Sequence, residues 1–210
     1  MQITKQDIEG MPQRYRAAFI NGLSGAKSAN LIGTCNQAKQ TNLAMVSSVF
    51  HIGANPPLMG VIFRPNSVPR HSFENILAHK WFTINHVNTN IVRQAHQTSA
   101  RYDEDTSEFE VTGLSEQWVD SIPVPFVQES SIKLALKLVG HQHLSINNTE
   151  LVIGEIQHII TPDDVINEDG SLNFSDTGIV AVTGLDTYHK LTKVTRLSYA
   201  KPNKDLHELE

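Results

Sequence analysis

The residues best suited to binding chemistry lie between Arg64 and Ser72, in the segment RPNSVPRHS. Arg70 and His71 directly precede Ser72, and the apolar spacing after it predicts a helix over residues 72–79 with Ser72 as its N-cap. Free backbone N–H groups at a helix N-terminus, with guanidinium groups beside them, form a phosphate-binding arrangement. The alternative is a capped helix with solvated arginines.

A second candidate feature is the pair Ser47 and Ser48, which interrupts an otherwise apolar segment. The segment predicts a strand over residues 43–52. Small side chains on such a strand let a flat ligand approach the backbone, whose N–H and C=O groups can bond the edge of a heterocycle. The alternative is a sheet in which both serines bond neighbouring backbone groups.

Other polar residues suggest weaker sites. His141 and His143 alternate on one face of a strand or turn, and His158 lies on the next predicted strand. No H-E-x-x-H spacing accompanies them, so we expect no metal site. His189 follows Tyr188 after a glycine turn, where it could act as a proton donor or substrate anchor, or simply flank an amphipathic tyrosine. The single cysteine, Cys35, excludes an intrachain disulfide and a cysteine-based metal cluster.

Composition narrows the class of protein. The chain has 210 residues, 40% hydrophobic and 19% charged, which is typical of a folded globular protein. A net charge of -5 argues against general binding to nucleic acid or anionic membrane. No apolar run approaches the roughly 20 residues of a membrane helix, and no signal peptide is evident, so a cytoplasmic location is the default expectation.

The hydrophobic pattern predicts a mainly β protein. Thr4 and Asp7 form a weak capping box, and a helix follows over about 12–23. Strands are predicted over 29–35, 43–52, 58–63, 81–87, 132–139, 150–160, 178–185 and 194–199, with helices over 72–79 and about 90–99 and a surface loop over 102–110. The absence of strict strand–helix alternation and of G-x-G-x-x-G disfavours a Rossmann fold, so a closed antiparallel barrel fits better. We expect a single domain over 1–210, with a C-terminal extension from about 178.

Taken in order, these segments resemble the flavin reductase-like family with the FMN-binding split-barrel fold, in its flavoredoxin-like branch. The resemblance covers about Leu31 to Ile159. It rests on IGTCN, NLAMVSSVF, the NPP turn, RHSFENI, WFTIN, FEVTGL and LVIGEI, followed by GLDTYH and RLSYAKP near the C-terminus. Many members have Thr where this chain has Ser72, so the hydroxyl is retained.

The resemblance implies an antiparallel Greek-key barrel, a homodimer and FMN near the dimer interface. Carried over by position, the residues facing the isoalloxazine ring are Asn42 and the backbone of Val46, Ser47 and Ser48. Those serving the ribityl phosphate are Arg64, Arg70, His71 and Ser72, and Asn85 is a further cofactor-binding candidate.

The resemblance implies two functions with the same FMN site. One is an oxidoreductase in which NADH or NADPH reduces flavin or a small acceptor, and the other is a non-enzymatic electron carrier. Flavin carries the redox chemistry in both, which agrees with the absence of a catalytic triad or carboxylate pair. A histidine-rich barrel that binds metal or another small ligand is the interpretation from outside the family.

Overall fold

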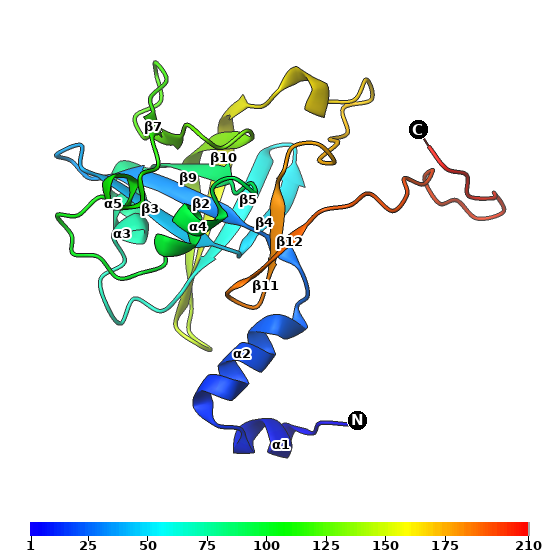
Figure 1. The fold of residues 1–210 in the computed structure, drawn as a ribbon, viewed down its shortest axis with the longest axis horizontal. Helices are drawn as coiled ribbons and strands as arrows, with labels where there is room; N and C mark the ends of the chain where they lie inside the picture. The colour runs from blue at the N-terminus through cyan, green and yellow to red at the C-terminus, as the bar shows by residue number, and fades with distance from the viewer. Residues whose placement is uncertain (210) are drawn as a thin grey trace.

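The computed structural model describes residues 1–209, and its central element is a curved antiparallel sheet. Seven strands follow the spatial order β3-β2-β6-β9-β10-β5-β4 (Figure 1). Their bounds are β2 (Asn30–Cys35), β3 (Thr41–Val46), β4 (Val49–Ala54), β5 (Pro57–Phe63), β6 (Trp81–His86), β9 (Lys133–Leu144) and β10 (Thr149–Ile160). The two outermost strands, β3 and β4, are consecutive in the sequence and are joined at Ser47 and Ser48. The sheet therefore curls until its two ends meet.

Two smaller sheets accompany this barrel. The first has the order β1-β11-β12, with β1 (Lys27–Ser28), β11 (Val180–Thr183) and β12 (Thr187–Lys190). The second pairs β7 (Glu116–Gln117) with β8 (Phe126–Val127). The expected mainly β, antiparallel architecture is confirmed.

Short helices lie around the barrel. Their bounds are α1 (Lys5–Gly10), α2 (Gln13–Leu23), α3 (His71–His79), α4 (Val92–Gln97) and α5 (Glu108–Thr112), with a 3-10 helix, η1 (Asp163–Val165). The predicted capping box of α1 is present, with Asp7 N–H donating to Thr4 Oγ1 at 3.3 Å and Thr4 N–H donating to Asp7 Oδ2 at 2.7 Å. Helix α3 packs against β2 and β3, which places its N-terminus beside the barrel wall.

Close packing of the barrel explains why small residues recur in its strands. Every residue of β2 is buried. A Cβ on Gly33 would lie 2.5 Å from both the carbonyl oxygen of Pro125 and Oγ1 of Thr83, so no larger side chain fits there. Apolar side chains from the central strands and from α3 fill the space beside this strand, including Ile32, Ile76 and Phe82.

Three predictions about elements are wrong. The strand predicted over 43–52 is two strands, because the chain turns at Ser47 and Ser48 to pass from one end of the sheet to the other. Among the described residues, the segment 194–199 forms no strand and makes a single bridge, between Leu197 and Glu208. The end of the predicted loop over 102–110 is the start of α5, where Glu108 and Phe109 are buried.

The two terminal segments project from the barrel as arms (Figure 1). The N-terminal arm, residues 1–23, contains α1 and α2, neither of which has a buried residue. The C-terminal arm, residues 191–209, runs outward from β12 and folds back on itself at its end, where Ser198 N–H donates to the carbonyl of His207. None of the helices within residues 1–209 is both long and apolar enough to cross a membrane.

Candidate functional site

A buried polar network joins β3 to the start of α3. Ser72 Oγ donates to Asn42 Oδ1 at 2.7 Å, and Asn42 Nδ2 donates to Glu108 Oε2 at 2.5 Å. The same carboxylate oxygen accepts the backbone N–H of Leu43 at 2.8 Å. All three polar side chains are buried, so the network holds the N-terminus of α3, strand β3 and α5 in fixed positions.

The chemistry of this network sets the direction of its hydrogen bonds. An ionised Glu108 carboxylate only accepts, so the Asn42 atom facing it is the amide nitrogen. The amide oxygen must then face Ser72, whose hydroxyl proton is committed to it. Ser72 can consequently accept a hydrogen bond from a ligand but has no proton left to donate to a phosphate.

The start of α3 corrects the predicted cap. The N-cap residue is Arg70, and Ser72 is the second residue inside the helix. The Arg70 side chain has no acceptor with which to cap the first turn, and the Ser72 hydroxyl is turned toward Asn42. The carboxylate of Glu74, in the same turn, accepts the backbone N–H of Arg70 at 3.2 Å. The N–H groups at the start of a helix have no carbonyl partner within the helix, so they stay available to an anion.

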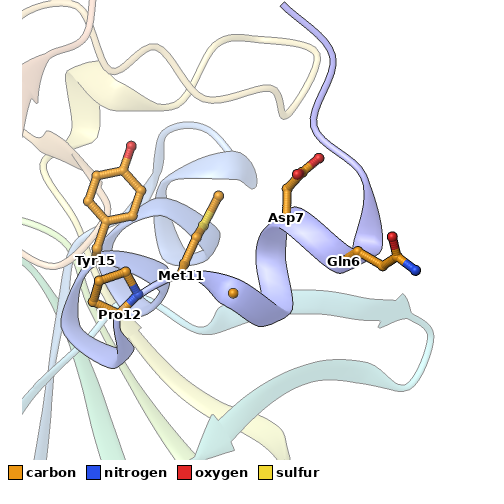
Figure 2. Close-up of a pocket in the computed structure, with 6 residues that line it drawn as sticks. Gln6, Asp7, Met11, Pro12 and Tyr15 are labelled. Carbon is orange, nitrogen blue, oxygen red and sulfur yellow. The ribbon is translucent and has the colours of Figure 1, made fainter.

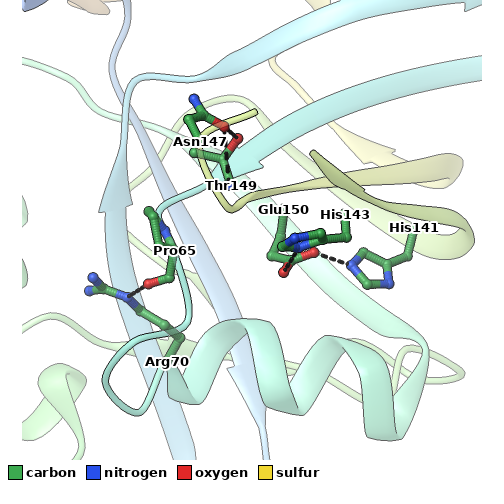
Figure 3. Close-up of polar contacts among 7 residues, drawn as sticks. All are labelled: Pro65, Arg70, His141, His143, Asn147, Thr149 and Glu150. Carbon is green, nitrogen blue, oxygen red and sulfur yellow. Dashed lines mark hydrogen bonds and ion pairs between the residues drawn. The ribbon is translucent and has the colours of Figure 1, made fainter. Parts of the chain in front are cut away.

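Positive charge gathers beside this N-terminus. Arg70 Nε donates to the carbonyl of Pro65 at 3.5 Å, which folds the arginine back over its own loop (Figure 3). Partial burial, then the nearby charges of Arg64 and Arg101, lower the pKa of Arg70. Within residues 1–209 none of these three arginines forms an ion pair with a carboxylate. The cluster of like charges therefore favours an anionic ligand.

A small cavity of about 30 Å³ lies beside this helix N-terminus, lined by Asn36, Gln40, Thr41, Asn42, His71, Glu74, Asn75 and Glu104. It has roughly the volume of one water molecule, so it cannot enclose a ring system. A flat ligand at this site would have to lie along the open surface of the barrel.

The predicted ring-facing residues follow along the same strand. Val46 ends β3, and Ser47 and Ser48 form the link to β4; all three are half-buried. Ser48 Oγ donates to the carbonyl of Ile62 at 2.7 Å, so its role is to hold this link against β5. With a strand rise of about 3.3 Å per residue, Asn42 and Val46 lie roughly 13 Å apart along the strand. The strand thus connects the anion-binding end to a separate surface with small side chains.

Asn85 is not at this surface. It is fully buried in β6, where its Oδ1 accepts Val127 N–H at 2.9 Å and its Nδ2 donates to Leu31 O at 3.1 Å and Thr83 Oγ1 at 2.9 Å. The structure therefore places Asn85 apart from the other predicted site residues. Its hydrogen bonds join three segments of the core.

His189 lies on β12, the edge strand of the small sheet, and is exposed. Its neighbour Tyr188 packs on the core, and the Tyr188 hydroxyl lies 3.0 Å from His96 Nδ1. This sheet is not hydrogen-bonded to the seven-stranded sheet, and among the described residues no hydrogen bond or ion pair joins His189 to Arg70 or Ser72.

Two histidines of the β9–β10 hairpin form hydrogen bonds with the same carboxylate. His141 Nε2 lies 2.6 Å from one oxygen of Glu150, and His143 Nδ1 lies 2.8 Å from the other (Figure 3). Hydrogen bonds from His143 and then His141 lower the pKa of Glu150. Among the described residues, no group of three or more His, Cys, Asp or Glu side chains is arranged to hold a metal ion.

Two contributors to the site escaped prediction. Glu108 lies in an acidic segment that is typical of a surface loop, and only its neighbour Phe109 signalled burial. Arg101 is distant in sequence from Arg64 and Arg70, so no local spacing could connect them. Both come to the site because the segment after α4 returns to β3, where Thr41 Oγ1 lies 2.7 Å from Ser107 Oγ.

A larger open hollow of about 500 Å³ lies in the bend between α1 and α2 (Figure 2). Its lining is Gln6, Asp7, Gly10, Met11, Pro12 and Tyr15. The only charged side chain in this lining is Asp7, an acid already engaged in capping α1. The hollow consequently does not suit a phosphorylated ligand.

Comparison with known proteins now adds to this geometry. Residues 24–183 match the model of the flavin reductase like domain. The chain belongs to this family. A crystal structure of a split barrel domain protein from Shewanella frigidimarina NCIMB 400 is 54% identical, with a TM-score of 0.92 over 95% of this chain and 100% of that chain. The split-barrel fold predicted from the sequence is therefore confirmed.

More distant structures share the fold. The flavoredoxin of Desulfovibrio vulgaris (Miyazaki F) is 20% identical, with a TM-score of 0.70 over 85% of this chain and 92% of that chain. An FMN-binding protein from Thermus thermophilus is 14% identical, with a TM-score of 0.67 over 79% of this chain and 86% of that chain. Family membership makes this chain a flavin-related oxidoreductase or electron carrier.

Proposed function

We propose that the chain binds FMN as a homodimer and accepts hydride from NADH or NADPH, passing the electrons to flavin or to a small acceptor. The observation that carries this proposal is the start of α3. A helix N-terminus that receives no cap from its N-cap side chain is fixed to β3 through Ser72 and Asn42. It lies beside arginines that form no ion pair with a carboxylate within residues 1–209. Family membership and the fold shared with the FMN-binding protein from Thermus thermophilus support the choice of ligand.

The residues fit the two ends of FMN. At the phosphate end, the backbone N–H groups of the first turn of α3, including that of His71, would bind the phosphate oxygens, and the guanidinium groups of Arg70 and Arg64 would balance their charge. Ser72 contributes by positioning this turn, because its proton is held by Asn42.

The ring end is assigned to Val46, Ser47 and Ser48. Their small side chains leave the backbone at the β3–β4 link open to the edge of a heterocycle. The separation between Asn42 and Val46 along the strand provides for the ribityl chain that joins phosphate to ring. Asn85 is left out, since its amide is fully used within the core.

Bound FMN would supply the redox chemistry, and the protein would orient it and adjust its electronics by hydrogen bonds. Hydride transfer from a nicotinamide requires stacked rings at roughly 3–3.5 Å, and an open surface with small residues leaves room for that stack. No general base is needed for such a step. His189 therefore has no role in this proposal.

An electron carrier without its own turnover is the second candidate, and the fold shared with flavoredoxin favours it. Addition of NADH or NADPH to the FMN-loaded protein under anaerobic conditions separates the two. Bleaching of the flavin absorbance by either nucleotide supports the enzyme, and a spectrum unchanged by both supports the carrier.

The phosphate site is tested by Arg70→Ala, with Arg14→Ala as the matched control on the N-terminal arm. A charged hydrogen bond is worth about 1.5–3 kcal/mol, so Arg70→Ala should weaken FMN binding at least tenfold. Riboflavin, which lacks the phosphate, should be affected much less. Equal FMN affinity in Arg70→Ala and the control would refute the assignment.

A further inference from the structure

The chain exposes far more surface than a compact monomer of its mass. Its accessible surface is 13086 Å² for 23.4 kDa. The scaling law for folded monomers predicts about 9,700 Å² at this mass, which leaves an excess of roughly 3,400 Å². Obligate homodimer interfaces bury about 2,000–5,000 Å² or more over both partners, which is about 1,000–2,500 Å² or more from each. The excess on one protomer is therefore at least as large as the area that a permanent partner covers.

The two terminal arms carry exposed apolar side chains that the barrel does not cover. Leu23 on α2 is 64% exposed, and Val194 and Tyr199 in the C-terminal arm are 94% and 86% exposed. Such side chains cluster on surfaces that bind other proteins.

The arms nevertheless keep a defined course. The alignment with the Shewanella structure spans 95% of this chain at a TM-score of 0.92, whereas the arms make up about a fifth of its residues. Most of both arms must therefore follow the same path in that crystal structure. Arg196 also pairs with Asp169, which ties the root of the C-terminal arm to the segment before β11.

Charge distinguishes the arms from the body of the protein. Residues 24–190 contain 10 Lys and Arg against 17 Asp and Glu, a net charge of -7. The remaining residues, 1–23 and 191–210, contain 7 basic and 5 acidic side chains, a net charge of +2. The arms thus carry a small net positive charge, opposite in sign to that of the body, which favours their contact with the body of another copy of the same chain.

We infer that residues 1–23 and 191–209 are the arms with which one copy of the chain clasps a second copy. Both arms leave the barrel at the same small sheet: α2 leads into β1, and the C-terminal arm follows β12. A two-fold axis near this sheet would let each protomer extend both arms over its partner. The inference rests on the proposed homodimer and deepens it by naming the surface that forms it.

The test compares Val194→Asp with Ile146→Asp. Ile146 lies at the tip of the β9–β10 hairpin and is also 94% exposed, so the two substitutions are matched in chemistry and in exposure within the protomer. Sedimentation equilibrium measures the dimer dissociation constant of each variant. We expect Val194→Asp to raise it at least tenfold and Ile146→Asp to change it less than twofold.

A second variant, Leu23→Asp, tests the other arm and should also weaken the dimer at least tenfold. Urea unfolding of each variant checks that the protomer still folds. Three results would each overturn the inference. The wild-type protein could be monomeric at 100 μM, the dimer could be unaffected by both arm variants, or Ile146→Asp could weaken the dimer as much as they do. FMN titration of the wild type is scored separately, so failure of flavin binding leaves the result for the arms intact.

Discussion

Removal of the Glu108 carboxylate should destabilise the protein through β3. Oε2 of Glu108 is the acceptor for both Asn42 Nδ2 and Leu43 N–H, and all these groups are buried. In Glu108→Ala both donors lose their partner, and a buried unsatisfied donor costs about 1–3 kcal/mol. We therefore expect the free energy of unfolding to fall by about 3–4 kcal/mol.

Urea denaturation at pH 7 without flavin measures this change. Glu110→Ala is the matched control, because Glu110 occupies the same helix but is exposed. Glu108→Gln keeps a neutral acceptor for both donors and should cost only about 1 kcal/mol. If Glu108→Ala lies within about 0.5 kcal/mol of Glu110→Ala, the network does not stabilise the junction as described.

Three further substitutions test other parts of the structure. Burial lowers the pKa of His86 to about 4, so between pH 4 and 6.5 the unfolded state binds more protons than the folded state, and stability is lost as pH falls through that range. His86→Gln should remove this part of the slope of unfolding free energy against pH. An unchanged slope would contradict the assignment. In urea unfolding, Gly33→Ala should lower the free energy of unfolding by at least about 2 kcal/mol. The control Gly140→Ala should lower it by less than about 1 kcal/mol, because the added Cβ meets Ile153 at an ordinary 3.5 Å. Similar costs for the two variants would refute the packing argument. Lys133 Nζ donates to three buried or half-buried acceptors, so Lys133→Met should lower the melting temperature by several degrees, and an unchanged melting temperature would show that these acceptors find other partners.

Local patterns predicted most of the barrel strands because most have a mainly apolar segment between turn residues. The predicted strand over 43–52 failed for a tertiary reason. Ser47 and Ser48 are no weaker in strand propensity than many residues inside strands, and the break exists because β3 and β4 belong to opposite ends of the sheet order. The segment 194–199 has a strand-like pattern but, among the described residues, no strand beside it with which to pair.

The candidate site was predictable where its residues are neighbours in sequence. Arg70, His71 and Ser72 came from a single local signal, a basic pair before an apolar helix. The direction in which Ser72 points was not predictable, because Asn42 and Glu108 determine it and both are distant in sequence. The local sequence around Ser72 is compatible both with an N-cap position and with a position inside the first turn of the helix. Only tertiary contacts decide between the two.

Binding of FMN tests the central proposal most directly. The wild-type protein, stripped of any bound ligand, is titrated with FMN, and the change in flavin absorbance or fluorescence is recorded beside a titration with riboflavin. We predict saturable binding of FMN, at least tenfold tighter than that of riboflavin, because the phosphate engages the start of α3 and the arginines beside it. An absence of FMN binding would contradict the proposal, and equal affinity for the two ligands would contradict the phosphate site.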